Sequence, residues 1–320
     1  LKFNQKNYEL QATSCELRVR QSYGALVFLC FCAFVMYSVI FYNLKPLYAG
    51  ISFIKFRHTV NIETKKALAE KFLDSGSPYK DNLRQRFANQ IFLEAGGDYD
   101  TEYLKWGIER AIEEMKMSFK EHRGEFSYPF TLGNLYIRRA LVIGDVSYDN
   151  SIFYYKEALK LSPNRQPVIF QIATAYLLNG ENQNAIDILR EAVAYNDNIG
   201  QPHWRLGIAL LTDGQKELAY KSFKNSIERG FYGTLIDEMK RVAALCEEFN
   251  DSDCVVTLVI EIYETLITEG EESVESFLQL ASAYTEVKRY EDAQNMLLRI
   301  THIDPSLEQE VQVLLRQIGY

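Results

Sequence analysis

The first strong pattern in the chain is an uninterrupted apolar run, "YGALVFLCFCAFVMYSVIFYN", over residues 23–43, which contains no charged side chain. As an α-helix, this run is about 30 Å long, which is the thickness of the hydrocarbon core of a bilayer. The run is longer than the core of a signal peptide, and no small-residue cleavage site follows it. A buried helix of a soluble protein is rarely apolar on every face. The pattern predicts a transmembrane helix over residues 23–43, in contact with a lipid bilayer, after an N-terminal flank over residues 1–22.

The residues after the apolar run leave two interpretations open. Pro46 is expected to end the helix. The connector over residues 44–61 then alternates apolar residues with basic and small ones, as in an amphipathic segment at the membrane surface. Equally, it fits a first helix packed on the domain that follows. Lys and Arg number four before the span and five after it, within about 20 residues, so the positive-inside rule does not orient it.

From residue 62 onward, apolar residues recur at intervals of three and four, which is the helical period. Residues 62–125 are predicted to hold two or three helices, which form either a cap or degenerate repeats. Residues 126–320 carry a repeat of 34 residues, best seen when "QPVIFQIATAYLLNGENQNAIDILREAVAYND" is set above "GQPHWRLGIALLTDGQKELAYKSFKNSIERGF". Matching positions at this spacing include Ala173 with Gly207, Gly180 with Gly214, and Ala185 with Ala219.

The chemistry of the matched positions explains the period. Small residues such as Ala173 and Gly207 let two antiparallel helices cross closely, and large residues fill the gaps between them. Gly180 and Gly214 are expected to end the first helix of each pair in the left-handed conformation. This pattern resembles the tetratricopeptide (TPR) family. Further units are expected near residues 131–163 and 277–305, with a degenerate helical pair between Leu235 and Gly270. The predicted fold class is all-α: one transmembrane helix followed by an α-solenoid of TPR-type hairpins.

The TPR resemblance implies a right-handed superhelix with a concave face. An apolar groove of this kind receives an extended peptide or a helix of a protein partner. The alternative is that a neighbouring helix of this same chain fills the groove. By their positions in the repeat, the candidate partner-contacting residues are Phe170, Thr174, Leu177, Leu178, Trp204, Ile208 and Leu211.

Charge and motifs exclude several other functions. The formal net charge of −8 disfavours nucleic acid, because phosphate binding requires a basic patch. No nucleotide-binding loop or zinc motif occurs, and the four histidines lie far apart in the sequence. The acidic stretches "GGDYDTEY" and "NDSDC" lack calcium-loop spacing and are interpreted as solvated loops or helix N-caps. We therefore expect no catalytic, cofactor or metal site, and no enzymatic activity in this chain by itself.

Five cysteines are present, at positions 15, 30, 32, 246 and 254. An odd number without regular spacing is not a disulfide framework. Cys30 and Cys32 lie inside the apolar run and are interpreted as packing residues. Cys246 and Cys254 could pair across a turn, but we favour the interpretation that they are small apolar fillers.

Several segments together resemble one group of bacterial membrane proteins. These segments are "FYNLKPLYAG" after a span, "ALKLSPNRQPVIFQIATAYLLNGENQNAIDILREAVAYN", and "PHWRLGIALLTDG". They resemble the C-terminal part of O-antigen ligase or polymerase-like proteins that end in TPR repeats. The resemblance implies a polytopic glycosyltransferase of the bacterial inner membrane, whose catalytic loops are not in this chain. A first residue that is Leu and not Met fits a processed form or a piece of a longer protein.

Three functional hypotheses follow. The preferred one is a membrane-anchored adaptor or scaffold that binds another protein through the groove. The second is the docking tail of a larger glycosyltransferase. The third is a structural subunit of a large membrane complex.

Overall fold

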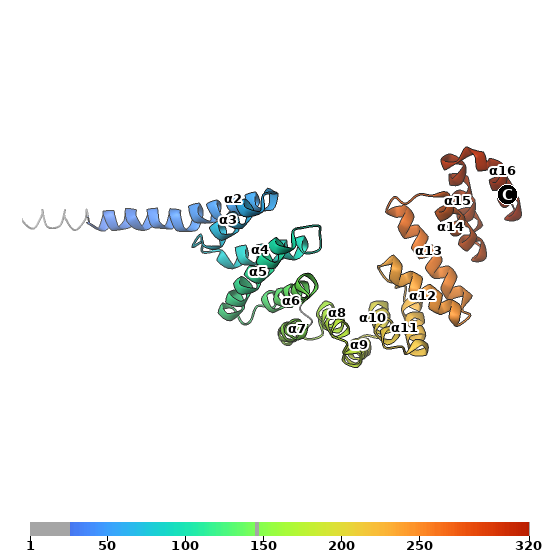
Figure 1. The fold of residues 1–320 in the computed structure, drawn as a ribbon, viewed down its shortest axis with the longest axis horizontal. Coiled ribbons are helices and arrows are strands. Elements are labelled where there is room, and N and C mark those ends of the chain that lie inside the picture. The colour runs from blue at the N-terminus through green and yellow to red at the C-terminus, as the bar shows by residue number, and fades with distance from the viewer. Residues whose placement is uncertain (1–25, 145–146, 320) are drawn as a thin grey trace, which may run out of the picture. The chain divides into compact units, whose positions relative to one another are not determined.

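The computed structural model describes residues 26–144 and 147–319, and in this part of the chain all regular structure is helical, with no strand (Figure 1). The predicted flank over residues 1–22, the first three residues of the predicted span, and Cys15 lie outside the described residues. The chain divides into two compact units, Leu1–Val146 and Ser147–Tyr320. The predicted boundary at residues 125 and 126 differs from this division and stays a prediction about the repeats. Each unit is described by itself.

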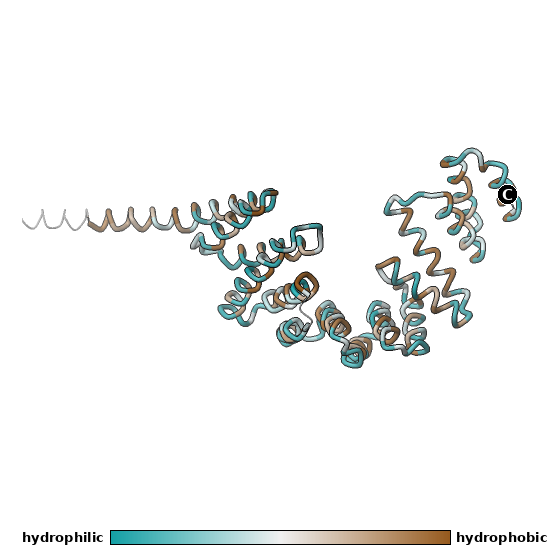
Figure 2. Tube along the Cα trace, in the orientation of Figure 1, coloured by the Kyte–Doolittle hydropathy of each residue, from teal (hydrophilic) through white to brown (hydrophobic). Residues whose placement is uncertain are grey.

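The first unit begins with one long helix, Leu26–His58, of 33 residues. Within the described ranges it is the one helix long and apolar enough to cross a membrane, by length and composition. Figure 2 shows apolar positions along its first half, where side chains such as Phe28, Phe34 and Met36 are exposed. Cys30 and Cys32 lie on this half as free thiols.

Pro46 does not end this helix, so that prediction was wrong. A π-helical turn, η1 (Ile40–Leu44), precedes helix α2 (Lys45–His58), and Pro46 lies in the first turn of α2. The N–H of Lys45 donates to the carbonyl oxygen of Ile40, five residues earlier. A proline lacks an N–H and crowds the carbonyl four residues before it. The wider π-turn accommodates this crowding, so the chain remains helical on both sides.

One face of α2 packs onto the rest of the first unit, so the connector contributes a helix to this unit. Ala49, Ser52, Phe53 and Phe56 are buried at helical spacing, and α2 contacts both α3 (Ile62–Leu73) and α4 (Lys80–Glu94). The ring of Phe56 lies 5.7 Å from that of Phe72 on α3 and 5.6 Å from that of Phe87 on α4. These aromatic contacts join the apolar helix to the helices that follow it.

The rest of the first unit consists of α3, α4, α5 (Thr101–Glu121) and α6 (Ser127–Ile143). Three helices therefore occupy residues 62–125, within the predicted range of two or three. A buried ion pair joins α3 to α4, with 2.7 Å between Lys65 Nζ and Glu94 Oε1. The Lys65 ammonium also lies over the rings of Phe56, Tyr99 and Tyr103 at 5.1 to 5.3 Å. These contacts offset the desolvation of a buried charge.

The second unit is a series of helices in which each one contacts the next along the chain. In order they are α7 (Asp149–Leu161), α8 (Gln166–Leu178), α9 (Asn182–Tyr195), α10 (Gly200–Thr212), α11 (Lys216–Glu228), α12 (Ile236–Glu248), α13 (Ser252–Thr268), α14 (Val274–Glu286), α15 (Tyr290–Ile303) and α16 (Glu308–Gln317), with a short 3₁₀ turn η2 (Pro305–Leu307) before α16. The pair α12 and α13 fills the stretch that was predicted to be a degenerate hairpin.

The predicted helix ends are confirmed at both matched glycines. Gly180 and Gly214 have φ of 76° and 81°, in the left-handed region that favours glycine. Beyond each glycine, an N–H returns to a carbonyl of the last helical turn, from Glu181 to Tyr176 (2.8 Å) and from Gln215 to Leu210 (2.9 Å). This is the Schellman arrangement, and its recurrence after 34 residues shows that the sequence repeat is a structural repeat.

The small residue at the helix crossing is also required by the packing. An added Cβ on Gly207 of α10 would lie 2.7 Å from a ring carbon of Phe223 on α11. Phe223 itself is fully buried, as are Ala185 and Ala219 at the matched positions of α9 and α11. The fold class is therefore the predicted one: an all-α chain with a leading apolar helix and TPR-type helical hairpins.

Candidate protein-binding surface

The predicted groove residues belong to α8 and α10, the first helices of two consecutive hairpins, which contact one another. Five of the seven predicted residues have accessible side chains. Leu178 is 43% exposed, and the half-buried ones are Thr174, Leu177, Ile208 and Leu211. The structure thus leaves a partly open, mainly apolar strip along these two helices.

The other two predicted residues, Phe170 and Trp204, are buried, which corrects their assignment to an open groove. Trp204 is only 1% exposed. Its ring lies 5.0 Å from that of Phe223, and its indole Nε1 donates to a carboxylate oxygen of Glu238 at 3.1 Å. A large aromatic residue at this repeat position fills the space between neighbouring helices, so its burial reflects packing within the fold.

Arg205, the next residue on α10, was missed by the sequence analysis. Its guanidinium carbon lies 5.9 Å from the ring centroid of Phe170 on α8. Its Nε is buried and has no hydrogen-bond partner, and across the described ranges no carboxylate forms an ion pair with this arginine. The preceding repeat has Gln171 at the matched position. The change from a neutral residue to a cation between the two repeats could have drawn attention to Arg205. That its guanidinium has no carboxylate partner among the residues that the structure describes is visible only in the three-dimensional structure.

A cavity of about 460 Å³ opens elsewhere on the second unit, between α7 and α9 beside the start of α8. Its lining is mainly apolar, with Ile169, Ile188 and Tyr195, and Lys156 and Lys160 also line it. None of the predicted groove residues lines this cavity. The predicted strip and this cavity are therefore separate surfaces.

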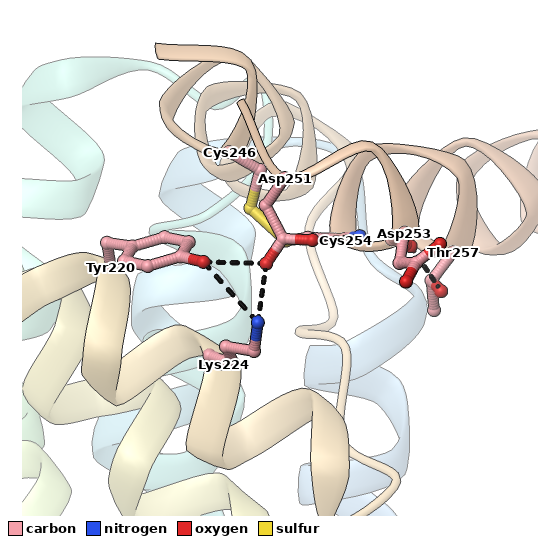
Figure 3. The surroundings of a disulfide bond; sticks show 7 residues. All are labelled: Tyr220, Lys224, Cys246, Asp251, Asp253, Cys254 and Thr257. Atoms are coloured by element: carbon pink, nitrogen blue, oxygen red, sulfur yellow. Dashed lines mark hydrogen bonds and ion pairs between the residues drawn. A yellow bond between two sulfur atoms is a disulfide. The ribbon is translucent and has the colours of Figure 1, made fainter. Parts of the chain in front are cut away.

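Cys246 and Cys254 form a disulfide, so the favoured interpretation of these residues as unpaired fillers was wrong (Figure 3). Their Cα atoms are 6.0 Å apart, because the turn between α12 and α13 brings the end of one helix next to the start of the other. Both residues are also buried. Burial alone would fit a filler, and the geometry of the turn is what permits the bond.

Asp251 anchors the same turn to α11. Its carboxylate caps α13 by accepting from the N–H of Cys254 at 3.2 Å. Figure 3 shows Tyr220 and Lys224 turned toward the same carboxylate, at 2.6 and 2.8 Å. Hydrogen bonds from Lys224 and Tyr220 lower the pKa of Asp251 from 3.8 to about 2, against a smaller opposing effect of burial. Of the two interpretations of the stretch "NDSDC", a solvated loop or a helix N-cap, the structure shows the N-cap, at Asp251.

The first unit brings together three possible metal ligands that the sequence did not connect. Ligand atoms of Asp81, Glu121 and His122 lie within 4.8 Å of one another. However, the guanidinium of Arg84 lies 3.0 Å from Asp81 and 3.6 Å from Glu121, and Asp81 also pairs with His122 at 3.0 Å. Arg84 and Lys80, which lies 3.2 Å from Glu121, already pair with these carboxylates, so the cluster fits an ion-pair network better than a metal site.

No protein-family model matches this sequence, and no curated protein matches it. Solved structures that resemble this chain include TPR proteins. A tetratricopeptide repeat protein from Parabacteroides merdae is 10% identical, covers 86% of this chain and 99% of its own, and gives a TM-score of 0.49. The Pseudomonas aeruginosa protein pilF is 15% identical, with coverages of 76% and 97% and a TM-score of 0.45.

A third structure, the TPR protein TTC0263 from Thermus thermophilus, is 17% identical, with coverages of 63% and 98% and a TM-score of 0.39. All three TM-scores are below 0.5. These likenesses therefore concern the helical-repeat architecture and say nothing about the function of this chain.

Proposed function

We propose that this protein is a membrane-tethered TPR-type scaffold that binds an acidic segment of a protein partner on the strip formed by α8 and α10. The observation that carries the proposal is Arg205, a cation without an ion-pair partner among the described residues, beside accessible apolar side chains. A partner carboxylate would supply the missing charge pair, and Leu177, Leu178 and Ile208 would receive apolar side chains next to it.

The tether supplies the mechanism. A leading helix in the bilayer holds the strip close to other membrane components, and this raises their effective concentration without any additional contact. No proton transfer or bond cleavage is required of the chain, so its activity is binding.

The disulfide favours a location of the repeats on one particular side of the membrane. Disulfides persist in oxidising compartments and are rare where thiols are kept reduced. Given the resemblance to bacterial membrane proteins, we place the repeats on the outer face of the bacterial inner membrane.

Site-specific photocrosslinking in native membranes tests the binding surface. A photoreactive p-benzoylphenylalanine at position 178 is compared with the same group at position 218, because Leu178 and Leu218 are both 43% exposed. We expect a discrete protein adduct from position 178 alone. Arg205→Glu should weaken that adduct at least about tenfold, since charge reversal replaces attraction with repulsion. Equal adducts from both positions, or an adduct insensitive to Arg205→Glu, would contradict the proposal.

A second candidate is the docking tail of a larger membrane glycosyltransferase. The helical continuity from Leu26 to His58 favours it, because movement of the spanning segment would be transmitted directly to the first repeat unit. This candidate predicts that the native polypeptide that carries these repeats also carries the further apolar spans of the enzyme, which its mass in native membranes would show. Fixed stoichiometry with several different proteins would instead indicate a structural subunit of a membrane complex.

A further inference from the structure

We propose that one face of α2 lies against the headgroup region of an anionic bilayer and holds the first unit beside the membrane surface. We call this face the α2 stripe, and it consists of Leu47, Tyr48, Ile51 and Ile54. The inference rests on the proposed membrane tether and adds to it the surface that touches lipid beyond the span.

The α2 stripe is opposite to the face that α2 buries. Ala49, Ser52, Phe53 and Phe56 pack against α3 and α4, whereas the four stripe residues are exposed, with Ile54 at 59%. At 100° per residue, the centres of the two faces differ by about half a turn. Both faces are apolar, so packing within the unit explains only one of them, and the α2 stripe is left without a cover from the described residues.

The α2 stripe continues the exposed surface of the apolar helix. From Leu26 to Ile54, exposed apolar residues follow the helix for about 43 Å at 1.5 Å per residue. The hydrocarbon core of a bilayer is only about 30 Å thick. A helix with a longer apolar surface tilts or lays its excess along the interface. Because the excess is confined to one face, the α2 stripe can meet the interface while the opposite face carries the first unit.

Charge favours lipid over a protein as the occupant. No acidic residue occurs between Leu26 and Ile62, and the last turn of α2 carries Lys55, Arg57 and His58. Basic side chains near an anionic surface are attracted to it. Apolar residues that end in a basic turn are the pattern of a segment lying at a lipid interface. Tyr48 adds an aromatic ring with a polar tip, which suits the same depth.

Depth-dependent fluorescence quenching of the full chain tests the α2 stripe. Cys15, Cys30 and Cys32 are changed to serine and the disulfide is kept. One cysteine is then introduced as Phe31→Cys, Ile54→Cys or Leu93→Cys, and is labelled with an environment-sensitive fluorophore. Leu93 on α4 is 67% exposed and serves as the matched control outside the α2 stripe. Vesicles contain phosphatidylglycerol with brominated acyl chains, which quench from within the bilayer, and iodide quenches from the water.

We expect strong bromolipid quenching at position 31 and several-fold greater quenching at position 54 than at position 93, where iodide should dominate. Replacing phosphatidylglycerol with phosphatidylcholine should reduce the quenching at position 54 and leave position 31 unchanged.

Three results would overturn the proposal. Quenching at position 31 with none at position 54 would contradict lipid contact by the α2 stripe and would still support the membrane tether. Shielding of position 54 from both quenchers would assign the stripe to a protein neighbour or a second copy. Absence of lipid quenching at position 31 would contradict both the membrane tether and the lipid contact of the α2 stripe.

Discussion

Two neighbouring residues on α10, Trp204 and Arg205, have opposite roles although they are adjacent in the sequence. Trp204 faces α11 and is enclosed by aromatic rings, whereas Arg205 lies over Phe170 of α8. One step along a helix turns a side chain by about 100°, which is enough to exchange the interior for a surface. Repeat position alone therefore did not distinguish the buried Trp204 from Arg205, which is only half-buried.

The burial of Trp204 changes the expected effect of its removal. Trp204→Ala should lower the free energy of unfolding by about 3–5 kcal/mol, because it removes a large side chain and leaves a cavity beside Phe223. Thermal or denaturant unfolding of the purified protein measures this loss. Tyr195→Ala, at a 65% exposed position of α9, is the control and should change stability by less than about 0.5 kcal/mol. An unaltered unfolding transition in Trp204→Ala would contradict the packing role of Trp204 and favour its original assignment to the open groove.

At the scale of elements, some features follow from local sequence rules, whereas others depend on backbone geometry that the sequence does not display. Gly180 and Gly214 end α8 and α10 in the left-handed conformation, which glycine adopts without help from a second helix. Local sequence therefore predicted these ends. The continuation through Pro46 depends on how the preceding turn widens. The pairing of Cys246 with Cys254 likewise depends on the path of one turn, and their sequence spacing does not determine it.

The turn that contains Asp251 should make stability depend on pH. The carboxylate has a folded pKa of about 2 against 3.8 in an ordinary setting. Because the unfolded chain takes up the proton first as pH falls, the stabilising effect is fully present above pH 3.8 and is lost as pH decreases toward about 2. At neutral pH, Asp251→Asn should cost roughly 0.5–1 kcal/mol, since Asn keeps the cap and loses the charge pair with Lys224.

Unfolding of Asp251→Asn and of the unmodified protein at several pH values measures this difference. The stabilities of the two proteins should converge as the pH falls from 3.8 toward about 2. Asp253→Asn is the matched control, because Asp253 lies in the first turn of α13 but bonds neither Tyr220 nor Lys224. A difference between Asp251→Asn and the unmodified protein that persists unchanged at the lowest pH would contradict the assigned cause.

At the scale of the whole molecule, the proposed placement of the repeats outside the cytoplasm predicts the redox state of two cysteines. In a chain with Cys15, Cys30 and Cys32 changed to serine, Cys246 and Cys254 should resist a polymer-tagged maleimide after rapid denaturation of cells. A reductant given first should allow both to react. An additional Cys246→Ser change should leave Cys254 reactive without reductant, which shows that the reagent reaches it. Two tags without reductant would place the repeats in a reducing compartment.

The sequence by itself determined the helical class, the 34-residue repeat, the left-handed helix ends and the presence of one long apolar helix. The helical period, the left-handed ends and the apolar run depend on neighbours within a few positions. The 34-residue repeat is a match of residue types that the sequence displays directly. The tertiary structure decided that Trp204 is internal and that Cys246 pairs with Cys254. Among the described residues, it also shows that Arg205 has no acidic partner and that only one face of α2 is covered. Each of these depends on which distant or turn-linked atoms come into contact, and residue spacing along the chain does not specify that.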